Sequence, residues 1–199
     1  MTTDPASPTP PITEVPWHGH THPDEVLSII DARHGNAFAF LGAHGAEDGG
    51  TVIRVFRPDA AAVTILLPDR EIEAEQLHGA GFFAAVVPGE ASWSPADGYS
   101  LRLQGHGAGG TTWETRDPYS FENVLADDAL HYFSEGRNWR LAETLGANAA
   151  TIDGVEGFVF SVWAPNARRA SVVGDFNGWD GRIHPMRKRV EAGVWELFV

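Results

Sequence analysis

The chain has 199 residues, 43% of them hydrophobic, and a formal net charge of −13. This length allows one domain or two of about 100 residues each, and the negative charge argues against nucleic acid or an anionic membrane as a partner. The absence of cysteine excludes disulfides and thiolate chemistry, and no apolar run in the sequence is long enough to span a bilayer.

Residues 1–20 are rich in Pro, Thr and Ser, which predicts a disordered tail. This segment has neither the basic start nor the apolar centre of a signal peptide. His18, His20 and His22 alternate as metal ligands can. A flexible tail gives such rings no second shell to orient them, so we interpret them as polar tail residues and predict no metal and no cofactor.

Residues 21–36 carry a helix pattern. Pro23 suits the first turn, Val26 and Ile29 lie along one side, and Gly35 is a plausible end. We expect a docking helix without chemistry of its own.

Residues 37–116 predict a first β-sandwich, because short alternating segments are each bounded by Gly, Pro or Asp. The expected strands are Thr51 to Arg57, Ala62 to Leu67, Ile72 to Leu77, Gly81 to Val87 and Tyr99 to Gln104. Trp113, shortly after the last of them, could cover a sheet edge.

Residues 117–157 predict a packed linker with a short helix around Val124 to Phe133. Gly136 and Gly146 mark turns in it. We expect the large apolar side chains of the linker to be buried, namely Leu130, Tyr132, Phe133, Trp139 and Leu141.

Residues 158–199 begin with an alternating strand, Phe158 to Trp163, followed by a turn at Pro165-Asn166. A second strand is expected from Ala170 to Gly174. The next segment places an Asn-Gly turn immediately before Trp179, which is typical of a loop that presents an aromatic ring.

An internal repeat links the two halves. The segment from Val52 to Ala60 aligns without gaps with the segment from Val159 to Ala167, 107 positions later, and Gly81 corresponds to Gly193. The predicted fold is therefore all-β, with two tandem immunoglobulin-like antiparallel β-sandwiches, a short N-terminal helix and a partly helical linker. Counterparts of the last strands of the first copy would fall after Val199, so we expect the second sandwich to be incomplete.

Several short motifs resemble the bacterial glycogen branching enzyme family from about His34 onward. The SVWAPNA and VVGDFNGWD segments resemble the starch- and glycogen-binding module of these enzymes. The other matching motifs are Ser134-Glu135-Gly136, Glu143-Thr144-Leu145-Gly146-Ala147, Asp153-Gly154-Val155, His184-Pro185-Met186 and Val194-Trp195-Glu196-Leu197. The resemblance implies a parent that transfers α-1,4-glucan chains to form α-1,6 branches. It also implies a cytoplasmic, monomeric parent whose C-terminal catalytic domain is missing here.

Glucan (glycogen or amylose) is the partner that the resemblance implies, with Trp179 and Asn177 as the contacts. An indole can stack on a sugar ring, and the Asn177 amide can bond sugar hydroxyls as donor and acceptor. The alternative is that Trp179 is a core residue. Trp163 and Trp195 are expected to pack inside the fold.

No catalytic residue is predicted. Retaining glycosyl transfer needs two carboxylates facing one bond, and nothing marks Asp175 or Asp180 as such a pair. In the resembled enzyme the catalytic pair lies on a barrel of about 250 residues, which does not fit here. We therefore expect a non-catalytic segment, inactive alone, that positions glucan and braces the barrel. The alternative is a stand-alone glucan-binding adaptor.

Overall fold

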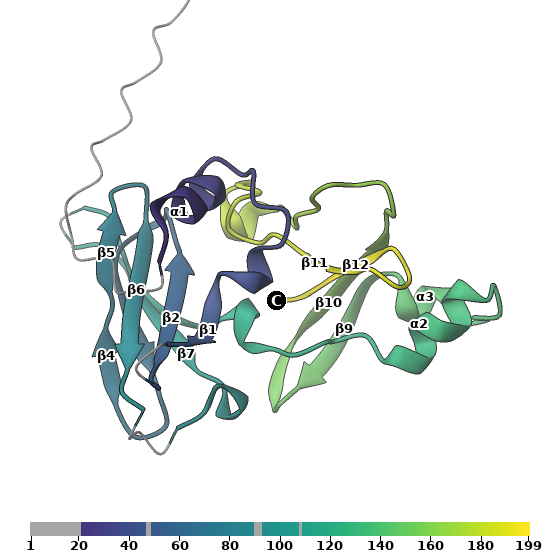
Figure 1. The fold of residues 1–199 in the computed structure, drawn as a ribbon, viewed down its shortest axis with the longest axis horizontal. Helices are drawn as coiled ribbons and strands as arrows, with labels where there is room; N and C mark the ends of the chain where they lie inside the picture. Colours follow the sequence, from purple (N-terminus) through teal and green to yellow (C-terminus); the bar gives the residue numbers. More distant parts are fainter. Residues whose placement is uncertain (1–20, 47–48, 90–92, 108) are drawn as a thin grey trace, which may run out of the picture.

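The structure is a computed structural model that describes residues 21–46, 49–89, 93–107 and 109–199. The predicted tail, residues 1–20, lies outside the described residues. Antiparallel strands dominate the described part (Figure 1). The strands are β1 (Gly42–Gly45), β2 (Thr51–Phe56), β3 (Ala60–Leu66), β4 (Glu71–Glu73), β5 (Glu75–His78), β6 (Phe82–Val87), β7 (Ser100–Gly105), β8 (Thr112–Arg116), β9 (Gly146–Ile152), β10 (Val155–Trp163), β11 (Arg187–Arg189) and β12 (Val194–Phe198). The helices are α1 (Pro23–Ile30), α2 (Asp127–Ser134) and α3 (Leu141–Thr144), and the 3-10 turns are η1 (Ala37–Ala39), η2 (Pro95–Asp97), η3 (Pro118–Ser120) and η4 (Asp175–Asn177).

The first module is a sandwich of two four-stranded antiparallel sheets, with strand orders β1-β2-β6-β5 and β4-β3-β7-β8. Alternation along β2 sends Ile53 and Val55 toward the space between the sheets. There they pack with Ile65 and Leu101 of the facing sheet. Trp113 packs against this core from the edge strand β8, where the sequence places it.

Helix α1 covers the outer face of the sheet that contains β2. Val26 and Ile29 pack there against Val52 and Phe56, so β2 is buried on both faces. The helix is shorter than predicted. It ends at Ile30, and the chain turns with Ala32 in the left-handed region at φ 58°, so Gly35 is not the terminator.

The second module repeats the first of these sheets. Its strand order β9-β10-β12-β11 matches β1-β2-β6-β5. Even the register agrees, because Val159 pairs with Phe198 as Val52 pairs with Val86. Gly193 also repeats Gly81, since both have positive φ and a Cβ at either would collide with the proline of the preceding turn.

One expected strand does not form. Ala170 to Gly174 contributes only an isolated bridge between Ser171 and Pro185. Its counterpart β3 is held between β4 and β7. Ala170 to Gly174 has no such neighbouring strand within the described part of the chain, and it forms a loop.

The segment between the modules contains more regular secondary structure than the single short helix that was predicted. The helix predicted around Val124 to Phe133 is α2, and α3 follows it. Strand β9, within the segment predicted as linker, pairs along β10, and β10 itself begins at Val155 rather than Phe158. Residues 146–157 are thus part of the second sheet.

Burial in this segment is uneven. Leu130 is buried, and Phe133 packs against the same cluster as Phe198. The expectation is wrong for Tyr132, Trp139 and Leu141, which are exposed. Trp195 is buried as expected, whereas Trp163 is largely exposed and touches only the ring of Phe133 among the aromatics of the described residues.

A buried carboxylate fastens the segment to the second sheet. Glu196, which is 0% exposed, accepts hydrogen bonds from the backbone N–H groups of Val124 and Leu125 at 3.2 and 3.0 Å. Its charge is balanced by Arg187 at 2.8 Å and Arg189 at 3.4 Å. Each oxygen of this carboxylate therefore has partners, which makes its burial tolerable.

The two modules touch each other. The guanidinium of Arg187 stacks on the ring of Phe38, 4.5 Å from its centroid. Arg182 donates to the carbonyl of Ile30 at the end of α1, at 3.4 Å, and lies over the ring of Phe56. Phe38 belongs to the first module in sequence, yet it packs against the core of the second. Among the described helices, none is long and apolar enough to cross a bilayer.

Candidate functional site

The loop that carries Trp179 is a tight, defined turn. The 3-10 turn η4 is followed by Gly178 at φ 59° and Trp179 at φ 61°. The backbone N–H of Trp179 reaches back to the carbonyl of Gly174, at 3.0 Å. A tryptophan in the left-handed region is strained, and such strain persists only where the surroundings fix it.

Trp179 itself faces solvent. Its side chain is 67% exposed, so the prediction that it could be a core residue does not hold in this structure. The indole N–H donates to the Asp175 carboxylate at 2.9 Å, which fixes the ring relative to the loop. Val173 and Phe176, which lie close by in sequence, are also exposed.

Asn177 lies beneath the loop instead of on it. Its side chain is buried, and its amide donates to the carbonyl of Val172 at 2.9 Å. Its Oδ1 accepts from the N–H of Gly174, also at 2.9 Å. The amide that was expected to bond sugar hydroxyls is therefore already occupied in holding the loop.

A histidine completes this support. Nδ1 of His184 lies 2.9 Å from the Asn177 amide nitrogen, which donates, so Nδ1 must be unprotonated. Burial, with the nearby guanidinium of Arg57, lowers the pKa of His184 to about 4. Sequence reasoning noted His184 only as part of a motif, because its contact with Asn177 depends on the folded loop.

The two carboxylates that flank the loop have partners of their own. Asp175 holds the indole, and Asp180 forms an ion pair with Arg182 at 2.6 Å. Arg182 keeps the pKa of Asp180 below its usual value. Both groups thus serve the conformation of the loop.

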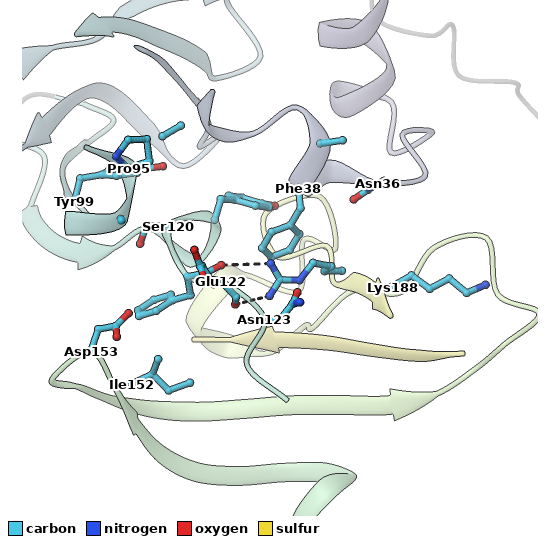
Figure 2. Close-up of a pocket in the computed structure, with 16 residues that line it drawn as sticks. Asn36, Phe38, Pro95, Tyr99, Ser120, Glu122, Asn123, Ile152, Asp153 and Lys188 are labelled. Atoms are coloured by element: carbon cyan, nitrogen blue, oxygen red, sulfur yellow. Dashed lines mark hydrogen bonds between the residues drawn. The ribbon is translucent and has the colours of Figure 1, made fainter. Parts of the chain in front are cut away.

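A cavity of about 840 Å³ lies between the modules, away from Trp179. Figure 2 shows it with Asn36 and Phe38 on one side and Ile152 and Asp153 on the other. Arg187, which lines the cavity, lies over the ring of Phe38 and donates hydrogen bonds to the carbonyl oxygens of Phe121 and Glu122, which follow η3. This cavity is a seam between the modules. The contact of Arg187 with Phe38 crosses it, whereas the hydrogen bonds of Arg187 join β11 to the segment that connects the modules.

Two family models match the chain. Residues 22–119 match the family described as alpha-1,4-glucan branching enzyme GlgB, N-terminal domain, and residues 144–199 match carbohydrate-binding module 48 (isoamylase N-terminal domain). The Trp179 loop and the sheet β9-β10-β12-β11 lie within the second match. The class of this part is therefore a carbohydrate-binding module of family 48.

Curated relatives extend the match over most of the chain. A 1,4-alpha-glucan branching enzyme GlgB 1 from Xanthomonas campestris pv. campestris is 49% identical over 178 residues, which are 89% of this chain and 23% of the relative. The GlgB of Paramagnetospirillum magneticum is 51% identical over 172 residues, 86% of this chain and 22% of the relative. The chain thus belongs to the GlgB branching-enzyme family, matches its N-terminal domain over residues 22–119, and spans about a quarter of the length of these relatives.

Among solved structures, the catalytic module of the glycogen-degrading pneumococcal virulence factor SpuA matches with a TM-score of 0.32 and 20% identity. The match covers 40% of this chain and 12% of that one. An overlap this small supports no statement about the site.

Proposed function

We propose that this chain contacts α-1,4-glucan through Trp179, as the glucan-positioning part of a 1,4-α-glucan branching enzyme of glycogen biosynthesis. The observation that carries the proposal is an exposed indole, fixed by Asp175 on a strained loop, inside a carbohydrate-binding module. A sugar ring has a flat apolar face that can stack on such an indole.

The role of Asn177 in this proposal is indirect. The side-chain amide of Asn177 forms hydrogen bonds with Val172, Gly174 and His184, so it positions the loop. Other groups would bind the sugar hydroxyls. It is a positioning residue, and the contact area comes from the aromatic ring.

The expected affinity of one such contact is low. Covering one face of an indole removes roughly 80 Å² of apolar surface from water, worth about 2 kcal/mol. After the cost of association, this yields binding no tighter than about millimolar. Tight binding of glycogen therefore needs further contacts.

In the parent enzyme, we propose that the modules brace a catalytic domain that forms α-1,6 branches by chain transfer, in a cytoplasmic monomer. The match to the GlgB N-terminal domain supports this placement. The alternative, a glucan-binding adaptor without an attached enzyme, would share the same site.

Native electrophoresis through gels containing glycogen tests the proposal. We expect the unsubstituted chain to be retarded by glycogen and Trp179→Ala to lose most of that retardation. Trp163→Ala is the matched control, because Trp163 is also exposed but leans on Phe133 of α2. If Trp179→Ala is folded by circular dichroism and still migrates like the parent chain, Trp179 is not the glucan contact.

A further inference from the structure

A second tryptophan of this chain is exposed more fully than Trp179. Trp139 lies between α2 and α3, and 95% of it is open to solvent. Within the described residues its ring has no aromatic partner and its N–H donates no hydrogen bond, so packing does not account for its position.

The loop that carries Trp139 is anchored on both sides of the indole. The amide of Asn138 donates to Thr144 in α3 at 2.9 Å and to the carbonyl of Ala129 in α2 at 3.3 Å. Its Oδ1 accepts from the N–H of Arg140 at 2.9 Å. The residues before and after Trp139 are thus fixed by one side chain, and the indole is held outward by a built turn.

Polar groups surround the ring. Trp139 and Tyr132 line a depression of about 860 Å³ whose other lining side chains include Asp128, Arg137, Arg140 and Glu143. The Arg140–Glu143 pair is exposed, with 3.6 Å between its charged atoms, so its hydrogen-bonding groups can turn to a ligand at little cost.

We propose that Trp139 and this depression form a second glucan contact, separate from the Trp179 loop. The proposal rests on the proposed function, since it takes the same ligand. One large aromatic face within a ring of charges of both signs suits a neutral, hydroxyl-rich chain. The lining also includes Asp128 and Glu143, and acidic side chains are depleted at protein–protein interfaces.

The two contacts lie far apart. Helices α2 and α3 project at the right of Figure 1, whereas the Trp179 loop lies beside α1, to whose end Arg182 is bonded. A short oligosaccharide can occupy only one of them, but a glycogen particle can engage both at once. The second binding event is then intramolecular, and retention on the polymer exceeds what either contact achieves alone.

Nuclear magnetic resonance of the ¹⁵N-labelled chain tests this, because each of its 7 tryptophans contributes one indole N–H signal. Trp139→Phe and Trp179→Phe assign two of them. On titration with maltoheptaose, we expect both signals to shift, whereas that of Trp195, whose N–H is bonded to the carbonyl of Ala164, stays fixed. On glycogen gels, we expect Trp139→Ala to weaken retention by about tenfold. In Trp139→Ala, the affinity of the Trp179 loop for maltotriose should not change, because so short a sugar occupies only one contact.

The outcomes separate the two proposals. A shift of Trp179 alone overturns the second contact and leaves the proposed function standing. A shift of Trp139 alone keeps the second contact and removes Trp179 as the glucan residue. If neither signal moves, both proposals fail. A Trp139 signal that ignores sugar but changes with protein concentration means that the ring binds another copy of the chain, which also overturns the inference.

Discussion

At the residue scale, the Trp179 loop depends on a histidine that must stay neutral. His184 accepts a hydrogen bond from Asn177 through Nδ1, and protonation of that atom would remove the bond. Arg57 and Asp59 of the first module are the charged groups that act on the pKa of His184. Arg57 has the larger effect of the two, because its positive charge opposes a second one on the ring. The loop is thus sensitive to acid through a group that no ligand touches.

The folded protein lowers the pKa of His184 from 6.5 to about 4, so the unfolded chain binds this proton more readily. The resulting stability is fully present above about pH 6.5 and is lost as pH falls toward 4, a loss of about 3 kcal/mol. Urea unfolding of the parent chain and of His184→Gln, whose amide accepts but does not titrate, measures it. We expect the parent chain to lose more stability than the variant across this window. Parallel curves would contradict the assignment, since all other titrating groups are common to both proteins.

At the element scale, the carboxylate of Glu196 joins strand β12 to the start of the α2 segment. We expect Glu196→Gln to lower the free energy of unfolding by about 3 kcal/mol, because it leaves Arg187 and Arg189 without their buried counter-charge. Glu191→Gln is the control. Its carboxylate also pairs with Arg189, at 2.9 Å, but is exposed, so its loss should cost less than about 1 kcal/mol. Equal losses in urea unfolding would show that burial of Glu196 does not matter.

Secondary-structure elements were predictable where the sequence pattern that defines them lies within the element itself. Strands β2, β6 and β10 were predicted because alternation and flanking turns lie within each segment. The internal repeat predicted that the segments after Gly81 and Gly193 correspond, and the structure pairs β6 with β2 and β12 with β10 in the same register. Ala170 to Gly174 has the composition of a strand, but it joins none of the described sheets, so its local composition did not decide its structure.

The candidate site was predictable only in part for the same reason. The Asn-Gly-Trp sequence indicated a loop with an aromatic ring, and the structure has one. Which side chain of that loop faces inward depends on His184 and Val172, which lie outside the loop. Trp139 was predicted to be buried from its apolar character alone, whereas Asn138 turns it outward.

At the scale of the whole molecule, one partly buried residue of the first module packs against the core of the second. Phe38 precedes the first sandwich but packs with Trp195 and Leu197 of the second, and its ring contacts Tyr119 at 4.8 Å between centroids. The modules should therefore unfold together although each has its own sheets.

We expect calorimetry of the parent chain to give a single transition and Phe38→Ala to give two, with the second module unfolding first. Removing a partly buried phenylalanine costs a few kcal/mol, about 3 at most here, and that loss falls on the contact between modules. Phe158→Ala is the control, because Phe158 is half exposed and is not among the residues that pack with Phe38 against the core of the second module. A single transition in Phe38→Ala would mean that other contacts, such as those of Arg182 with Ile30 and Phe56, suffice to couple the modules.

The position of β12 within its sheet has a consequence for synthesis on the ribosome. This strand follows β9, β10 and β11 in sequence, yet it lies between β10 and β11 in space. Until β12 has been synthesised, β9 and β10 form a hairpin in which one edge of β10 is unpaired. The backbone N–H of Leu125 also lacks its hydrogen-bond acceptor until Glu196 has been added. The first module has all its strands before then and can fold first. The nascent second module thus passes through a stage with an unpaired strand edge, which favours aggregation.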